Sequence, residues 1–164
     1  MNRAEIEDAL ERQHPTSFAW ALSCCGRDRE EAEDVLQEAC LKILDGRARF
    51  AGGSPFKTFL FGVIRRTAQE HRRRTWLRRL RLTSFSRAAG TPAPPANLEA
   101  RLSRLPVALT RLAKRQREVL DLVFGHGMTI EAAAEVMGIS LGSARVHYDR
   151  GKKRLRRELG EDRP

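Results

Sequence analysis

Apolar positions along this chain recur with the spacing of an α-helix, and the Val/Ile/Thr alternation typical of strands is missing. The pattern is clearest after Asp28, which can cap a helix with Glu31 as its capping-box partner. Apolar residues then follow at i, i+3, i+4, i+7 and i+11, at Ala32, Val35, Leu36, Ala39 and Ile43. This spacing predicts a helix over residues 28–45 with one buried stripe, in an all-α protein.

The opposite face of this helix is polar and acidic around a single hydrophobic residue. Its members are Asp34, Gln37, Glu38, Leu41 and Asp45. An isolated exposed leucine is common on protein surfaces, so Leu41 alone decides nothing. The alternative is a face that docks another protein, with acidic side chains around Leu41 as the hydrophobic anchor.

A second helix is predicted to begin with Ser54 as its N-cap and Pro55 at its first position. Its core stripe comprises Phe56, Phe59, Leu60, Val63 and Ile64, and we expect Phe59 to be mainly a core residue. Arginines follow, interleaved with His71 and Trp76. An aromatic ring beside arginines can stack on unpaired bases, but packing of Trp76 against the helix end is the interpretation we favour.

The C-terminal part of the sequence predicts three short helices in succession. The first covers residues 116–124, with Val119, Leu120, Val123 and Phe124 as its apolar positions. Thr129 can cap the next helix, over residues 130–137, and Gly138 can take the left-handed position that ends it. Ser140 can cap a last helix that runs to about residue 159, and Ile139 is expected to be buried in the turn. This is the plan of a helix-turn-helix, whose second helix enters the major groove of DNA.

The last helix has two different sides. Its expected inner side carries Leu141, Ala144, Tyr148 and Leu155. Its expected outer side carries Arg145, Val146, Asp149, Arg150 and Lys153. A helical hairpin that does not bind DNA would not need this much positive charge on its outer face. An aspartate at position 149 can accept a hydrogen bond from the N4 amino group of cytosine.

A Pro-rich stretch divides the chain. Pro92, Pro94 and Pro95 remove backbone donors within four residues and prevent a helix from continuing. We therefore predict two small helical domains, residues 1–82 and 104–164, joined by a Pro-rich linker over residues 83–103, with the helix-turn-helix in the second domain.

The positive charge of this 164-residue chain, formally +10, is unevenly distributed. Acidic residues predominate in residues 1–46, whereas basic residues concentrate in residues 65–81 and 145–157. Blocks of arginine and lysine attract polyanions and gain affinity by counterion release. The alternative interpretation is a solvated basic surface without a nucleic-acid partner. Two separate basic runs beside an acidic segment argue against this alternative. The distribution predicts nucleic acid as one partner and a protein as the other.

The chain lacks the motifs of common catalytic sites. It has no Walker phosphate loop, HExxH, CxxC or Gly-x-Ser-x-Gly sequence. His14, Cys24, Cys25 and Cys40 have poor spacing for metal ligands, so we expect reduced, partly buried thiols. We predict no catalytic residues, no metal and no cofactor. No apolar run is long enough to span a bilayer and no secretory signal is recognisable, which favours a cytoplasmic protein.

Several of these segments resemble one family. Residues 32–39 resemble the region 2.2 motif of bacterial RNA polymerase sigma factors, and residues 50–74 resemble regions 2.3 and 2.4. Residues 112–120 and 129–155 are similar to regions 4.1 and 4.2. The order of these motifs covers nearly the whole chain and resembles the small extracytoplasmic-function (ECF) sigma factors of the sigma-70 family.

The resemblance implies a promoter-specificity factor that binds core RNA polymerase, directs it to one class of promoters and helps to open the −10 region. It implies that the polymerase docks on Asp34, Gln37, Glu38 and Leu41. It assigns the −10 element to Arg65, Arg66, His71, Arg72 and Arg73. It assigns the −35 element to Ser143, Arg145, Val146, Asp149, Arg150 and Lys153.

The resemblance also implies an anti-sigma partner, which would clamp between the two domains and could hold the factor at the inner face of the membrane. Two other functions stay open on the residues alone. One is a stand-alone helix-turn-helix regulator whose N-terminal half senses a signal or dimerises. The other is a small nuclease or RNA-processing helper, which would need a metal-ligand set that the sequence does not offer.

Overall fold

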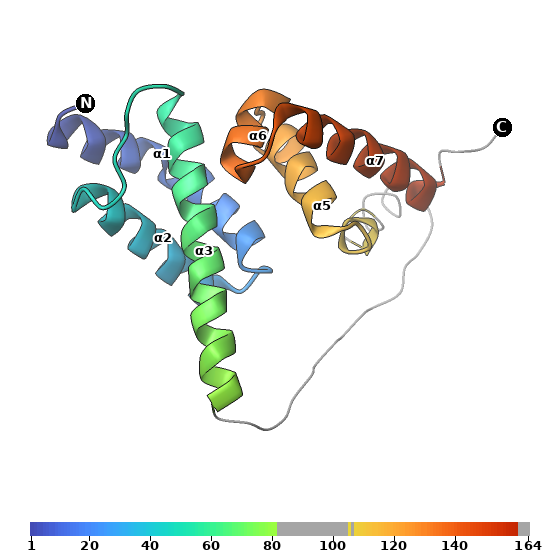
Figure 1. Ribbon diagram of the computed structural model, residues 1–164, viewed down its shortest axis with the longest axis horizontal. Helices are drawn as coiled ribbons and strands as arrows, with labels where there is room; N and C mark the ends of the chain where they lie inside the picture. The colour runs from blue at the N-terminus through green and yellow to red at the C-terminus, as the bar shows by residue number, and fades with distance from the viewer. Residues whose placement is uncertain (82–104, 106, 161–164) are drawn as a thin grey trace. The chain divides into compact units, whose positions relative to one another are not determined.

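The computed structural model describes residues 1–81, 105 and 107–160, and these residues form helices and no strand (Figure 1). Its elements are α1 (Arg3–Cys24), α2 (Arg29–Leu44), α3 (Phe56–Arg81), α5 (Lys114–Leu120), the π-helical turn η1 (Asp121–Gly125), α6 (Ile130–Met137) and α7 (Leu141–Leu159). The chain divides into two compact units, one in the N-terminal and one in the C-terminal part of the described residues. The all-α class with two helical domains is thus confirmed, while the predicted linker lies outside the described residues.

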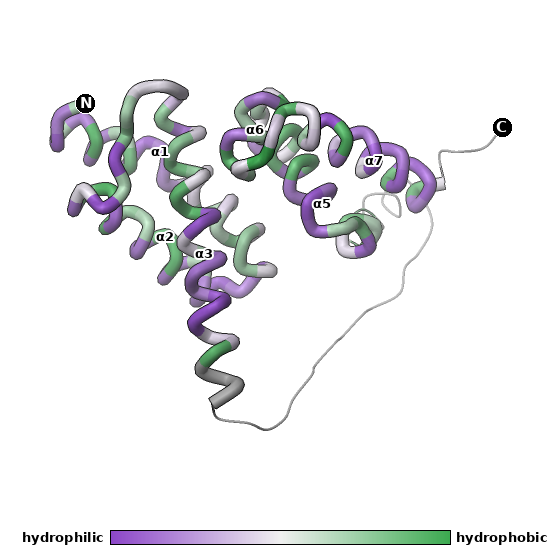
Figure 2. The backbone as a smooth tube through the Cα atoms, viewed as in Figure 1, coloured by the Kyte–Doolittle hydropathy of each residue, from purple (hydrophilic) through white to green (hydrophobic). Residues whose placement is uncertain are grey.

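The first unit contains three helices that all contact one another, α1, α2 and α3. Helix α1 was not among the predicted helices; it starts with a capping box between Asn2 and Glu5 and continues through Pro15. Helix α2 is capped by Asp28, whose side chain accepts from the Glu31 N–H at 3.0 Å. All five residues of its predicted apolar stripe are buried, so this prediction is confirmed. Figure 2 shows hydrophobic segments alternating with hydrophilic ones along these helices.

The core of the first unit is centred on an aromatic pair that the sequence pattern did not indicate. The Trp20 and Phe61 rings stack at 5.6 Å, and Trp20 Nε1 donates a hydrogen bond to the Phe61 carbonyl at 3.1 Å. Phe59 is only half-buried, because its ring packs in a peripheral cluster with Phe50 and Phe56. The Pro55 carbonyl accepts from the Phe59 N–H, so Pro55, rather than Ser54, occupies the N-cap position.

The second unit differs from the prediction at the end of its first helix. Instead of one regular helix over residues 116–124, α5 widens at Leu120 into the π turn η1. A π turn contains one more residue than an α turn, so it rotates the residues that follow. Leu122 therefore becomes fully buried, whereas Phe124, one of the apolar positions of the predicted helix, is 65% exposed.

The turn between α6 and α7 forms as the sequence predicts. The Thr129 hydroxyl accepts from the Ala132 N–H at 3.1 Å, and Gly138 has a left-handed φ of 62°. The Ser140 hydroxyl accepts from the Ser143 N–H at 3.2 Å and so caps α7. Ile139 is half-buried in the turn.

Helix α7 packs along α5 at very short range. Gly151 is buried, and a Cβ atom there would lie 3.0 Å from Leu120 Cδ1. The missing side chain at this position lets the two helices approach. Beside it, Ala144 is fully buried, whereas Leu141, Tyr148 and Leu155 are half-buried. Contact with α5 thus leaves the other side of α7 at the surface.

Candidate functional site

The predicted docking face of α2 is mostly at the surface. Asp34, Gln37 and Leu41 are exposed, and the Leu41 side chain is 46% exposed although it is apolar. These three residues follow one another at helical spacing, so they form one narrow stripe along α2. The stripe offers an apolar centre with a carboxylate and an amide beside it.

Glu38, the fourth residue of the predicted docking set, is turned toward α3. Arg74 Nη2 lies 2.8 Å from both of its carboxylate oxygens, and Lys42 Nζ lies 3.2 Å from one of them. Desolvation opposes ionisation of Glu38, but the hydrogen bonds from Arg74 and Lys42 prevail and lower its pKa. Glu38 therefore carries a charge that the first unit already compensates internally.

Lys42 extends this ion network along α3. Its Nζ lies 2.6 Å from a carboxylate oxygen of Glu70 and 3.2 Å from the Thr67 hydroxyl. Charges thus alternate from Arg74 through Glu38 and Lys42 to Glu70. The network joins α2 to the second half of α3, where the apolar core has ended.

The residues predicted for the −10 element separate into two groups. Arg72 donates to the Cys24 carbonyl at 2.6 Å, and His71 Nδ1 lies 3.2 Å from a Glu31 carboxylate oxygen. Glu31 therefore contacts α3 instead of closing the predicted capping box. Arg65 is half-buried. Arg66 and Arg73 are exposed and form no ion pair with the described part of the chain.

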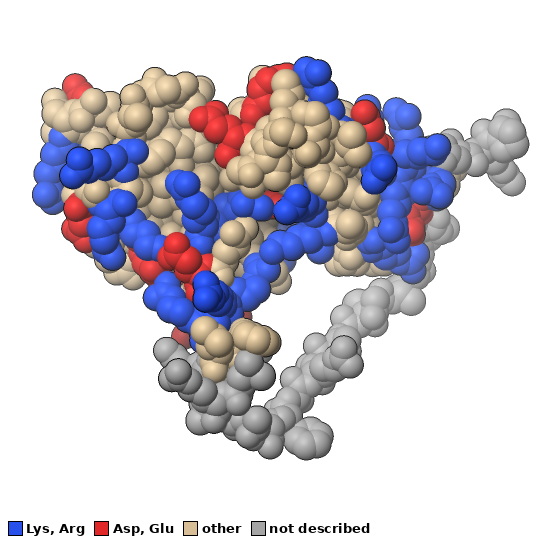
Figure 3. Space-filling view, in the orientation of Figure 1, with Lys and Arg blue, Asp and Glu red and all other residues tan. Residues whose placement is uncertain are grey.

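Trp76 lies at the surface near the end of α3. Its side chain is 58% exposed, so the favoured interpretation of packing against the helix end is wrong. Leu77 beside it is 43% exposed. The indole thus remains accessible on the arginine-rich half of α3, where Lys and Arg side chains gather in Figure 3.

The residues predicted for the −35 element all lie at the surface of α7. They are Ser143, Arg145, Val146, Asp149, Arg150 and Lys153. At about 100° per residue, Arg145 is rotated only about 40° from Leu141, so it lies at the edge of the exposed face rather than opposite the inner side. There its guanidinium lies 3.4 Å from a carboxylate oxygen of Glu131 on α6. The Ser143 hydroxyl bonds to Ser140 at 2.9 Å.

An aromatic surface on the second unit was not predicted. Phe124 stacks on Tyr148 at 5.9 Å, and Lys152 Nζ lies 5.1 Å from the centre of the Tyr148 ring. The sequence predicted a regular helix over residues 116–124, whereas Phe124 lies in the π turn. No spacing rule indicates that turn, so the sequence carried no usable signal for this surface.

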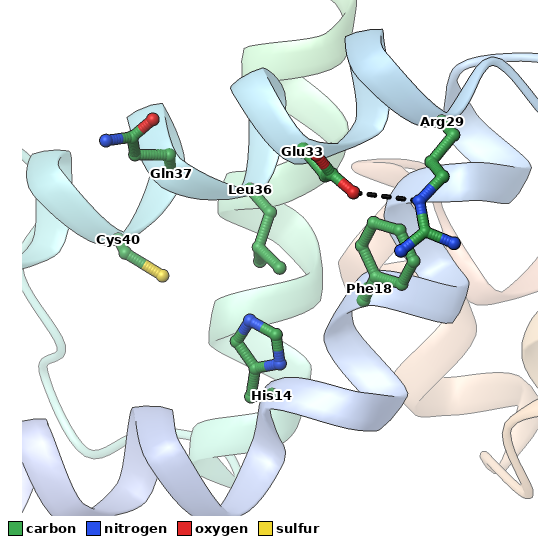
Figure 4. Close-up of a pocket in the computed structure, with 7 residues that line it drawn as sticks. All are labelled: His14, Phe18, Arg29, Glu33, Leu36, Gln37 and Cys40. Carbon is green, nitrogen blue, oxygen red and sulfur yellow. Dashed lines mark hydrogen bonds and ion pairs between the residues drawn. The ribbon is translucent and has the colours of Figure 1, made fainter.

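A pocket of about 440 Å³ lies between α1 and α2 (Figure 4). Phe18, Leu36 and Cys40 supply much of its apolar wall, and the ion pair of Arg29 with Glu33, at 2.9 Å, lies at one end. Gln37 lines the same pocket and so connects it with the predicted docking stripe. The pocket therefore adds a hollow to one side of that stripe.

The cysteines are free thiols, as predicted. Burial raises the pKa of Cys40, and burial followed by the charge of Glu31 raises the pKa of Cys25 to about 11. Both groups are thus protonated near neutral pH and are weak nucleophiles. Among the described residues, no three His, Cys, Asp or Glu side chains are arranged to hold a metal ion. No helix in that part of the chain is long and apolar enough to cross a bilayer.

Taken together, these features define a helix-turn-helix protein with a separate three-helix unit, basic residues on α3 and α7, and an exposed stripe around Leu41 on α2. The Sigma-70 region 2 family model matches residues 9–78, and the Sigma-70, region 4 model matches residues 98–155. The RNA polymerase sigma factor CarQ of Myxococcus xanthus is 32% identical over 159 residues, which cover 95% of this chain and 90% of CarQ. The ECF sigma factor ShbA of Streptomyces griseus is 28% identical over 91% of this chain and 84% of its own length.

Solved structures show the same similarity. The sigma factor RpoE of Bartonella quintana, in complex with the anti-sigma factor NepR, has a TM-score of 0.71 and 27% identity over 97% of this chain and 99% of its own. The fold also matches CnrH in complex with the cytosolic domain of CnrY, with a TM-score of 0.66. The chain belongs to the sigma-70 family and is an RNA polymerase sigma factor of the ECF type. It is a promoter-specificity factor for the initiation of transcription.

Proposed function

We propose that the exposed stripe of α2 is the surface on which core RNA polymerase docks, at the clamp helices of its largest subunit. The proposal is supported by the exposure of Leu41 between polar residues on a helix whose other side is fully buried. Asp34 and Gln37 supply the polar contacts, and Glu38 lies beside the stripe with its carboxylate paired to Arg74. The pocket beside Gln37 is suited to an apolar side chain of the same partner.

We infer that the second half of α3 contacts the −10 element and helps to open it. Arg66 and Arg73 are the best candidates for direct phosphate contacts, since neither is engaged within the described residues. Trp76 can stack on an unpaired base. Arg65 and Arg72 contribute positive charge, while His71 and Arg72 also hold α3 in place through Glu31 and the Cys24 carbonyl.

Helix α7 is proposed to read the −35 element in the major groove. Val146, Asp149, Arg150 and Lys153 lie on its exposed side, and Arg145 and Ser143 lie near its start. Arginine suits bidentate contact with guanine, and Asp149 suits cytosine N4. Lys153, farther along the helix, is assigned to phosphate. The domains are proposed to span residues 1–82 and 104–164, with the linker over 83–103.

An anti-sigma factor is the proposed regulator. The related RpoE of Bartonella quintana is solved in complex with the anti-sigma factor NepR. The factor is proposed to act in the cytoplasm, without catalysis of its own, and its anti-sigma partner can hold it at the inner face of the membrane.

Two linked experiments test the residue assignments. The chain is expected to co-purify with core polymerase and to support run-off transcription from genomic promoters. Leu41→Asp should weaken co-purification, whereas Arg150→Gln should leave co-purification intact and reduce transcription from −35-dependent promoters. If Leu41→Asp retains normal binding to core polymerase while its helical content is unchanged, the docking stripe is assigned wrongly.

A further inference from the structure

The two halves of α3 are attached to the first unit by different forces. The first half contributes Leu60, Phe61 and Ile64, which are almost fully buried. From Glu70 onward the attachment is ionic, and its shortest interhelical ion pairs connect Lys42 to Glu70 and Glu38 to Arg74. Ionic contacts between partly exposed groups can exchange partners at little cost, unlike buried apolar contacts.

Glu38 holds a special position in this arrangement. It lies on α2 between Asp34 and Leu41 of the proposed docking stripe, yet its side chain is only 27% exposed. Arg74 approaches both of its oxygens at 2.8 Å. A basic group of a docked partner can therefore bind Glu38 fully only by displacing the Arg74 guanidinium.

Arg74, for its part, lies on the arginine-rich segment of α3 directly after the exposed Arg73. Its guanidinium presents a planar fork that matches a carboxylate and a phosphate equally well. While it is bound to Glu38, Arg74 is neutralised and does not add to the phosphate-binding charge of α3. Once released, it would form one more contact with a nucleic-acid backbone.

We propose that Glu38 and Arg74 form an intramolecular clasp that withholds Arg74 from nucleic-acid phosphate until a basic group of the docked polymerase takes its place on Glu38. The proposal rests on the proposed docking role of α2. Opening the clasp does not detach α3, since Lys42 remains bound to Glu70 at 2.6 Å and to the Thr67 hydroxyl at 3.2 Å. Docking on one helix thereby adds a DNA contact on another.

The clasp is tested first in the free protein with a fluorescently labelled single-stranded DNA of mixed sequence. Glu38→Gln should strengthen binding and steepen the dependence of log K on log salt by about 0.7, the value of one added phosphate contact on a single strand. Between about 50 and about 200 mM salt, its advantage over the wild type should therefore shrink about threefold. The double variant Glu38→Gln with Arg74→Gln should lose this added slope.

Asp34→Asn is the matched control. It removes one negative charge from the same helix, but Asp34 forms no ion pair within the described residues. It should leave the salt slope at the wild-type value. An equal steepening in Asp34→Asn and Glu38→Gln would mean that only net charge matters, and it would overturn the clasp.

The second arm compares Arg74→Gln in the free protein and in the complex with core polymerase. In the free protein, this substitution should leave the DNA affinity unchanged, because Arg74 is already occupied. In the polymerase complex, it should weaken promoter binding severalfold. An equal loss in both states would refute the clasp, even though polymerase docking itself, scored by co-purification, would stand.

Failure of the chain to bind polymerase would instead contradict the proposed function, and the free-protein measurements would still decide the clasp. Circular dichroism and the melting temperature of each variant check that the helices remain folded. Arg74→Gln leaves the buried residues of α2 and α3 untouched, so it provides the readout if Glu38→Gln loses structure.

Discussion

Helices α3 and α7 carry similar runs of basic residues, but they use them differently. On α3, Arg72, Arg74 and His71 each contact α1, α2 or the turn between them. On α7, Arg150 and Lys153 extend from the exposed side without an ion pair to the described residues. A basic run therefore indicates where nucleic acid can bind, but not which of its residues are available.

The difference follows from how each helix is packed. Helix α3 contacts both α1 and α2, and acidic residues of α2 lie within reach of its second half. Helix α7 packs mainly against α5, along the side where Ala144 and Gly151 are buried. Basic residues on α3 can thus pair with other residues of the protein as well as with nucleic acid. Those on α7 are mainly available to nucleic acid.

The largest expected contrast between the helices is in stability. Phe61→Ala in α3 should cost ~3–5 kcal/mol of unfolding free energy, because it removes a fully buried ring stacked on Trp20. Leu155→Ala in the half-buried flank of α7 should cost ~1–2 kcal/mol. Urea denaturation measures both. Similar losses of unfolding free energy would show that α3 and α7 contribute equally to the stability of their units.

Variants of the docking stripe on α2 should lose polymerase binding, whereas variants of the basic residues on α7 should not. Leu41→Asp should weaken binding of core polymerase by ~2 kcal/mol, through the loss of an apolar anchor. Competition with a labelled sigma factor for core polymerase gives the value. Lys153→Gln serves as the control and should compete like the wild type; a comparable loss in this variant would place α7 in the docking surface.

A single arginine in each helix should give opposite results. Arg72→Gln should reduce stability by ~1 kcal/mol, since it removes a charged donor from the Cys24 carbonyl. Arg150→Gln should leave stability unchanged, weaken binding to the preferred duplex by ~1–3 kcal/mol and relax specificity at one base position. Thermal melting and fluorescence anisotropy test the pair. A lowered melting temperature for Arg150→Gln but not for Arg72→Gln would contradict this difference between the two helices.

The smallest expected effect is a dependence of stability on acid pH. The pKa of Glu38 is lowered in the folded state, so its stabilising contribution is complete above its ordinary pKa and is lost as the pH falls through the lowered value. Wild-type stability should therefore fall more steeply in that range than that of Glu38→Gln. Urea titrations at several pH values give the unfolding free energy of both proteins. If the two plots of unfolding free energy against pH run parallel, Glu38 makes no such contribution.

Local patterns in the sequence predicted much of the fold. The buried stripe of α2 and the caps at Asp28, Thr129 and Ser140 depend on residues three or four positions apart, and all of them are observed. The left-handed turn at Gly138 is equally local. Contacts between distant segments were not predictable: neither the stacking of Trp20 on Phe61 nor the pairing of Glu38 with Arg74 has a spacing rule.

The candidate site was predictable as a set of residues rather than as an arrangement. Sequence spacing placed Leu41 on a polar face and the six proposed −35 residues on one helix, and all of these are exposed. It could not indicate that Glu38 is engaged by α3 or that Trp76 extends into solvent. Both depend on where the second half of α3 lies relative to α2, which helical periodicity does not fix.

The π turn η1 also bears on which changes in chain length the second unit can accept. Such a turn contains one residue more than a regular α-helix needs. Deleting Val123 would let α5 continue as an ordinary helix, so the change could be absorbed locally. The same deletion inside α7 would rotate every later side chain by about 100° and would misalign its basic face. Deletion of a single residue in this helix-turn-helix unit should therefore be tolerated at residues 121–125 and be eliminated by selection in α7.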